Sequence, residues 1–177
     1  ERINPTGKKA LTQVLQAGLF DVAMQLADAQ IDAGAAVLDV NVGAPLVDET
    51  QLLPELVQRL VGRLPMPLSI DSSNATAIAN ALPYCPGSFL VNSISGEAGR
   101  MEQLGPLCRD FGAPFILLPL QGAHLPEKAA ERISTVESLT EKAEAMGISR
   151  RLMMVDILAL AVSSSADSAL QCLEMTR

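Results

Sequence analysis

Short apolar runs alternate with amphipathic segments along the whole chain. The runs are too short for helices and apolar at successive positions, a pattern typical of parallel strands that are buried on both faces. The predicted strands are 36–40, 67–70, 89–91, 115–118 and 151–155, and residues 1–7 are predicted to be the end of a further strand and its loop. The predicted helices between and after them are 20–33, 48–61, 75–82, 100–111, 127–146 and 166–175.

Turn residues mark the ends of these helices. Gly34, Gly112 and Gly147 stand where glycine commonly ends a helix, and Asp48 can cap the helix that follows it. Strands joined by helical crossovers are parallel, so the fold class is α/β. The strand count alone leaves two architectures open. One is an open doubly wound sheet, and the other is about six βα units of a (β/α)8 TIM barrel, which needs eight strands.

Four of the predicted strands end on uncharged amides or lone acids. These residues are Asp39 and Asn41, Asp71, Asn92 and Asp156. In a barrel the carboxyl ends of all strands open onto the face that holds the active site. A carboxylate can accept two hydrogen bonds from the amidine edge of a pterin or guanine-like ring, and an asparagine can both donate and accept. The sequence therefore predicts a pocket for a neutral, donor-rich heterocycle.

Each of these side chains also has a structural alternative. Asp71 could cap the next helix, and Asn92 could satisfy loop backbone. Asp39 and Asn41 are expected to brace the loop 42–45 rather than touch a ligand. Glu97 is expected at the solvated surface and His124 in an exposed loop.

Composition excludes several functions. The chain has 177 residues, is 49% hydrophobic and carries a net charge of −7, which disfavours nucleic acid and anionic membranes as partners. Cys85, Cys108 and Cys172 form no C-x-x-C pair and are expected to be buried free thiols, without a metal site. No apolar run reaches the roughly 18–20 residues that span a bilayer, and the start does not resemble a signal peptide. These features predict a cytoplasmic protein.

Several segments, taken in order, resemble the pterin-binding methyltransferase family. That family includes the folate domain of cobalamin-dependent methionine synthase and the methyltetrahydrofolate:corrinoid/iron–sulfur protein methyltransferase. The resemblance implies a single barrel domain over 1–177, truncated at its C-terminal side and in its N-terminal strand. The matching motifs are Glu1-Arg2-Ile3-Asn4-Pro5-Thr6-Gly7, Leu38-Asp39-Val40-Asn41-Val42-Gly43, Ser69-Ile70-Asp71-Ser72-Ser73-Asn74, Val91-Asn92-Ser93-Ile94-Ser95 and Val155-Asp156-Ile157-Leu158.

The same resemblance implies the reaction and its site. The N5 methyl group of methyltetrahydrofolate would pass to the Co(I) centre of a cobalamin or other corrinoid on a partner domain or protein. Asp71, Asn92 and Asp156 would hold the pterin ring, with Asn41 and Glu1 near the pocket floor. Asn92 and Asp156 would also serve the proton delivery to N5, and no metal ligand is implied. A homodimer is compatible with these expectations.

Two other functions stay open. Dihydropteroate synthase shares the barrel and the pterin-binding acid and amide, but it should carry a basic loop for pyrophosphate. Here the loop 41–49 reads Asn-Val-Gly-Ala-Pro-Leu-Val-Asp-Glu, which is neutral to acidic and suits an anion poorly. A folate-binding module without turnover is the second alternative.

Overall fold

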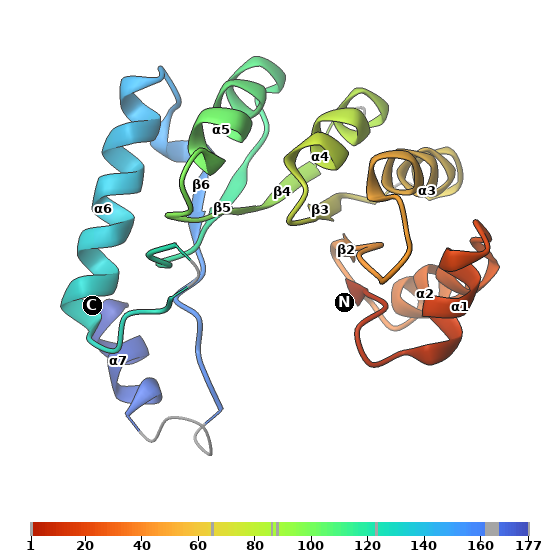
Figure 1. Ribbon diagram of the computed structural model, residues 1–177, viewed down its shortest axis with the longest axis horizontal. Helices are drawn as coiled ribbons and strands as arrows, with labels where there is room; N and C mark the ends of the chain where they lie inside the picture. The colour runs from red at the N-terminus through yellow and green to blue at the C-terminus, as the bar shows by residue number, and fades with distance from the viewer. Residues whose placement is uncertain are drawn as a thin grey trace. The chain divides into compact units, whose positions relative to one another are not determined.

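The computed structural model describes residues 2–64, 66–85, 87, 89–122, 124–161 and 167–176 (Figure 1). Strands and helices alternate, as the hydrophobic pattern predicts. The strands are β1 (Arg2–Ile3), β2 (Leu38–Val40), β3 (Leu68–Asp71), β4 (Phe89–Ile94), β5 (Phe115–Leu117) and β6 (Met153–Val155). The α-helices are α1 (Lys9–Gln16), α2 (Asp21–Asp32), α3 (Glu49–Arg63), α4 (Ala75–Ala81), α5 (Arg100–Phe111), α6 (Ala129–Ala145) and α7 (Ser168–Met175), and the 3-10 turns are η1 (Leu82–Tyr84) and η2 (Arg150–Leu152).

The chain divides into two compact units, and β4 crosses the division. Unit 1 is Glu1–Asn92, and unit 2 is Ser93–Arg177. In unit 1 the strands β1, β2, β3 and β4 follow one another in the sheet in chain order, and each adjacent pair is parallel. The register places Asp39 opposite Ser69 and Asp71 opposite Asn92. Parallel neighbours in chain order are what βα crossovers produce, so the predicted α/β class is confirmed.

One face of the unit 1 strands forms the hydrophobic core. Alternate strand positions point to opposite faces, and the apolar set is almost fully buried. The helix α3 contributes an apolar stripe at helical spacing and packs against α4. The buried strand residues are Leu38, Val40, Leu68, Ile70, Phe89 and Val91. With this face closed by helices, the opposite face of the same strands is left for polar side chains.

Unit 2 is built on β5 and β6, which pair in parallel from Phe115 opposite Met153 to Leu117 opposite Val155. The backbone N–H of Leu118 donates to the carbonyl of Ile94 at 3.0 Å, so the end of β4 borders the end of β5 within this unit. In β6 the side chains of Met154 and Val155 are 47% and 46% exposed. The expectation that this run is buried on both faces is therefore wrong for the structure described.

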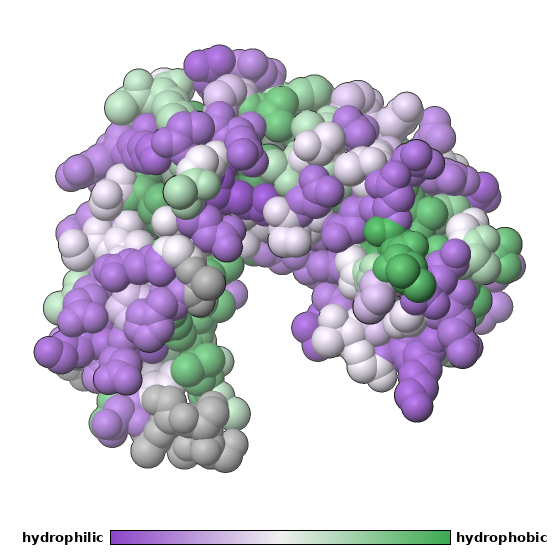
Figure 2. Space-filling model, in the orientation of Figure 1, coloured by the Kyte–Doolittle hydropathy of each residue, from purple (hydrophilic) through white to green (hydrophobic). Residues whose placement is uncertain are grey.

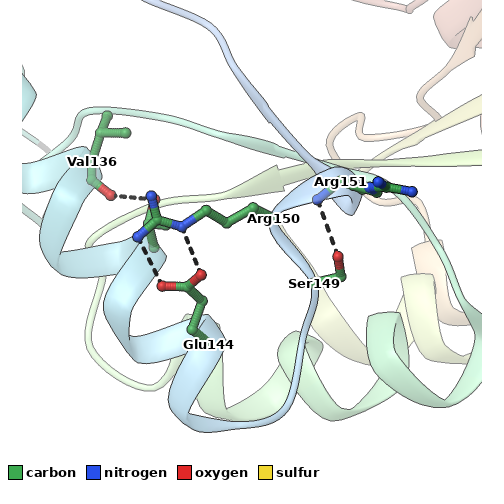
Figure 3. A network of polar contacts seen from close by, with 6 residues as sticks. Val136, Glu144, Ser149, Arg150 and Arg151 are labelled. Carbon is green, nitrogen blue, oxygen red and sulfur yellow. Dashed lines mark hydrogen bonds and ion pairs between the residues drawn. The ribbon is translucent and has the colours of Figure 1, made fainter.

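Surface ion pairs fix the connections of unit 2. Arg150 donates to Glu144 through Nε at 2.6 Å and through Nη2 at 2.9 Å, which joins the end of α6 to the turn before β6 (Figure 3). This contact holds the pKa of the Glu144 carboxyl below its usual range. Both side chains are exposed, so the pair fixes geometry more than it adds stability. On the face shown in Figure 2 the surface is mostly hydrophilic, as expected from the charged outer sides of the helices.

The element bounds differ from the sequence prediction in several places, among them β4, which ends at Ile94, and β6, which begins at Met153. The helix α1 was not predicted, because its buried residues are Leu11 and Leu15 alone, too few to show a helical period in so short a segment. The strand β2 begins at Leu38, two residues later than predicted. Asp48 caps α3, as expected, by accepting from Thr50 N at 3.0 Å.

The cysteines are buried and free, as predicted. Burial away from water disfavours the thiolate. It raises the pKa of the Cys85 thiol to about 11 and that of the Cys108 thiol to about 12. Neither thiol is therefore an available nucleophile near neutral pH.

Candidate functional site

Polar side chains line the face of the unit 1 strands that the core does not use. Asp39 and Asn41 are two residues apart, as are Ser69 and Asp71, so each pair points to one side of the sheet. The register carries the same face across to Asn92, which stands opposite Asp71. These polar groups were predicted at strand ends, and the structure brings four of them onto one face, with Asn92 inside β4 rather than at its end. These four are Asp39, Asn41, Asp71 and Asn92.

Asp39 is the centre of a hydrogen-bond network that spans three strands. Its Oδ1 accepts from the Ser69 hydroxyl at 2.6 Å and from Asn92 Nδ2 at 3.0 Å. Ser69 is 4% exposed, so its hydroxyl has little access to water. The expectation that Asp39 braces the loop 42–45 is wrong, because its side chain bonds across the sheet to neighbouring strands.

Asn41 has two functions at once. Its Oδ1 accepts from the backbone N–H of Gly43 at 2.7 Å, which is the predicted bracing of the loop. Its Nδ2 donates to Asp71 Oδ2 at 3.0 Å. The amide therefore fixes both the start of the β2–α3 loop and the orientation of the Asp71 carboxylate.

Asp71 does not cap the helix that follows it. The residue that caps α4 is Asn74, whose Oδ1 accepts from the N–H groups of Thr76 at 3.0 Å and Ala77 at 3.3 Å. The capping alternative for Asp71 is therefore wrong. The carboxylate is half-buried at the end of β3 and oriented by Asn41.

A second acid near this edge was missed by the sequence analysis. Glu49, the first residue of α3, accepts from the Ser72 hydroxyl at 2.5 Å, and Ser72 is 2% exposed. The same hydroxyl accepts from Asn74 N at 2.9 Å. These bonds tie the loop after β2 to the loop after β3. The one sequence signal for this contact is that Ser72 directly follows Asp71, at the end of a predicted strand.

A cation also belongs to this face. Arg2 is the register partner of Asp39 across β1 and β2. Since the side chains of paired residues on neighbouring strands point to the same face, the Arg2 side chain leaves β1 on the polar face. No role was predicted for Arg2 from the sequence. Glu1, which was predicted near the pocket floor, lies outside the described residues.

Asp156 belongs to unit 2 and directly follows β6. Its Oδ1 accepts from Leu158 N at 2.8 Å, and its own N–H donates to the carbonyl of Leu117 at 3.1 Å. The next carbonyl, that of Ile157, accepts from Arg132, which is 2% exposed and also donates to Pro126 O. A buried guanidinium thus holds the turn that presents the exposed Asp156 carboxylate.

The remaining candidates lie at the surface. Glu97 and His124 are both exposed, and His124 pairs with Gln121 through a short backbone bridge, which confirms the expectation for both. Within the described ranges, no cluster of three or more His, Cys, Asp or Glu side chains could hold a metal ion. In the same part of the chain, no helix combines the length and apolarity that crossing a membrane requires.

The chain also matches a known protein family. The profile of the family described as "Pterin binding enzyme" matches residues 1–175. The chain belongs to the pterin-binding enzyme family. This match confirms the resemblance that the strand-end motifs predict.

A family relative is the methylcorrinoid:tetrahydrofolate methyltransferase of Eubacterium limosum. It is 27% identical over 175 residues, which are 96% of this chain and 63% of the relative. Its name agrees with the methyltransferase branch of the family that the motifs resemble.

Similar solved structures show the fold. Yersinia pestis dihydropteroate synthase with a pterine-sulfa conjugate gives a TM-score of 0.70 at 22% identity, covering 98% of this chain and 65% of that chain. Xanthomonas albilineans dihydropteroate synthase in complex with 7,8-dihydropteroate gives 0.65 at 20% identity, with 98% and 63% covered. At this identity the likeness shows the fold alone, and it decides the open choice for part of a (β/α)8 barrel. The chain spans just under two thirds of the length of these relatives.

Proposed function

We propose that this chain binds a tetrahydrofolate and exchanges the N5 methyl group with the cobalt of a corrinoid on another domain or protein. The observation that carries the proposal is the connected polar face of Asp39, Asn41, Asp71 and Asn92. The Asp71 carboxylate accepts the ring N–H and exocyclic NH₂ of the pterin as a charge-assisted pair. Asn41 orients that carboxylate, which lowers the entropic cost of binding.

Asn92 is proposed to contact the ring beside Asp71. Its amide has two N–H donors, of which one is used on Asp39, so the other remains for a ring nitrogen or carbonyl. N5 is a good leaving group for methyl transfer only when it is protonated or hydrogen-bonded. Asn92 is the group of unit 1 proposed to hydrogen-bond at N5, and the family resemblance alone assigns Asp156 a part in the proton delivery. The corrinoid would supply the cobalt nucleophile that takes the methyl group.

The name of the Eubacterium limosum relative supports this reaction class and gives the direction from methylcorrinoid to tetrahydrofolate. The sequence motifs suggested the opposite direction, as in methionine synthase. Because the same bond is made or broken in both directions, the same pocket serves either. The direction in the cell then depends on the partner and its methyl source.

A dihydropteroate synthase reaction is the rival function within this family. It requires a pyrophosphate subsite near the pterin. In this chain the loop 41–49 has no lysine or arginine, and Asp48 and Glu49 place two carboxylates at its end. Glu49 is held in position by Ser72, so it would oppose an anion at this edge.

The test is an equilibrium titration of this chain with methyltetrahydrofolate beside dihydropterin pyrophosphate, followed by transfer to free cob(I)alamin measured by the absorbance of the corrinoid. We expect tighter binding of methyltetrahydrofolate and conversion of cob(I)alamin to methylcobalamin. Preference for the pyrophosphate ligand would replace the proposal with the synthase reaction. Binding without transfer to cobalamin would leave a folate-binding module.

Replacing Asp156 with asparagine is expected to weaken methyltetrahydrofolate binding by about fivefold, or about 1 kcal/mol. The asparagine oxygen can still accept from Leu158 N, so the turn is kept and only the charge is lost. Asp167→Asn removes another exposed acid of unit 2 and should leave the dissociation constant unchanged. An Asp156→Asn protein that binds as tightly as wild type would remove Asp156 from the pterin site.

A further inference from the structure

The loop after β2 carries a leucine in a backbone conformation that favours glycine. The N–H of Val47 donates to the carbonyl of Ala44 at 3.2 Å, which closes a four-residue turn. Pro45 occupies its second position and Leu46 its third, with φ of 66°. A proline followed by a positive φ is the pattern of a type II turn, in which glycine or asparagine normally takes the third position.

Leu46 gains nothing from this chain in return for that strain. Its side chain is 96% exposed. Figure 2 shows apolar side chains at the surface over the connection between β2 and α3. Backbone strain lowers stability, and strained residues concentrate where a binding function requires them.

The turn is held from both sides. Gln16 on α1 donates from Nε2 to the carbonyl of Pro45 at 2.8 Å. Before the turn, Gly43 N is bound by Asn41 Oδ1, and after it Asp48 caps α3. Leu46 is therefore presented by a fixed loop, and a fixed apolar tip loses little entropy when it becomes buried in a partner.

The same loop borders the candidate pterin site. It starts at Asn41, whose amide orients the Asp71 carboxylate, and every residue involved belongs to unit 1. A methyl group can pass to a protein-borne cobalt only if that protein covers the mouth of the pocket. Such a partner must contact the loop that forms the rim.

We propose that Leu46 is the anchor that docks the corrinoid-carrying protein onto this rim, an inference that rests on the proposed methyl exchange. A single exposed apolar side chain seated in a recess is a common centre of binding energy in an interface. The loop 41–49 has no cation and ends on Asp48 and Glu49. The partner surface it fits is therefore an apolar recess bordered by basic side chains.

The test compares wild type with Leu46→Gly on two methyl acceptors. One acceptor is free cob(I)alamin, and the other is the purified, reduced corrinoid-binding protein that wild type uses best within a panel. Leu46→Gly should keep or raise the melting temperature, because glycine accepts a φ of 66° without strain. Its kcat/KM should fall at least about tenfold with the corrinoid protein and stay unchanged with free cob(I)alamin.

The control is Leu170→Ala, which truncates a leucine that is 64% exposed on α7. It should change neither rate. Equal rates of Leu46→Gly and wild type with the corrinoid protein would overturn the docking role, as would equal losses on both acceptors. A weaker dissociation constant for methyltetrahydrofolate would assign Leu46 to the substrate instead. Failure of wild type to methylate free cob(I)alamin would reject the proposed function itself, which is a separate result.

Discussion

Replacing Asp71 with alanine is expected to weaken methyltetrahydrofolate binding about a hundredfold, or about 3 kcal/mol. The carboxylate is proposed to accept two hydrogen bonds from the pterin edge, and hydrogen bonds to a charged group are each worth about 1.5–3 kcal/mol. Alanine removes both bonds and also leaves Asn41 Nδ2 without its acceptor at the pocket floor. The measurement is the dissociation constant from an equilibrium titration at constant pH and salt.

Asp71→Asn separates charge from shape at the same position. An asparagine can direct its oxygen at Asn41, but its NH₂ then faces the donor edge of the pterin, so we expect a loss close to that of alanine. Asp28→Ala is the matched control, because Asp28 is another acid of unit 1 and pairs with Arg63 at the surface. It should leave the dissociation constant unchanged. A loss below about threefold for Asp71→Ala would show that the pterin lies elsewhere.

The fold was largely predictable because its strands are apolar and separated by clear turn signals. The strand end at Asp71 was predicted from the same pattern, whereas Asn92 lies inside β4, which continues to Ile94. The partners of these side chains were not predicted, since they depend on register. A shift of one residue between β2 and β3 would turn Asp39 away from Ser69 and toward the core. The alternating apolar pattern disfavours a one-residue shift but not a shift of two residues, which would keep the polar face and change every partner.

Two other features escaped prediction for local reasons. The helix α1 is short, and its amphipathic pattern rests on two leucines. The positive φ of Leu46 could not be predicted, because leucine is rarely found in that backbone conformation. Leu46 lies five residues after Asn41 of the polar face. Disagreement between local preference and structure is expected where a site imposes its own geometry.

Asp39→Ala is expected to lower the free energy of unfolding by about 3 kcal/mol, measured by urea denaturation. One Asp39 oxygen accepts from both Ser69 and Asn92, and the buried Ser69 hydroxyl would lose its acceptor. Asp39→Asn keeps an oxygen in place and should cost no more than about 1 kcal/mol. Ser69→Ala in the Asp39→Ala background removes the unsatisfied hydroxyl and should recover part of the stability. If Ser69→Ala recovers no stability in the Asp39→Ala background, the unsatisfied Ser69 hydroxyl is not the cause of the lower free energy of unfolding.

The same aspartate is expected to act on the ligand through Asn92. Asp39→Ala frees the Asn92 amide, so methyltetrahydrofolate binding should weaken about tenfold although Asp39 is not proposed to touch the pterin. A double-mutant cycle with Asn92→Ala distinguishes orientation from direct contact. If Asp39 works by holding the amide, the double variant binds no more weakly than Asn92→Ala alone. If the binding losses of Asp39→Ala and Asn92→Ala add fully in the double variant, Asp39 acts on the ligand independently of Asn92. Asp39 would then be a separate contact to the ligand and not a support for the Asn92 amide.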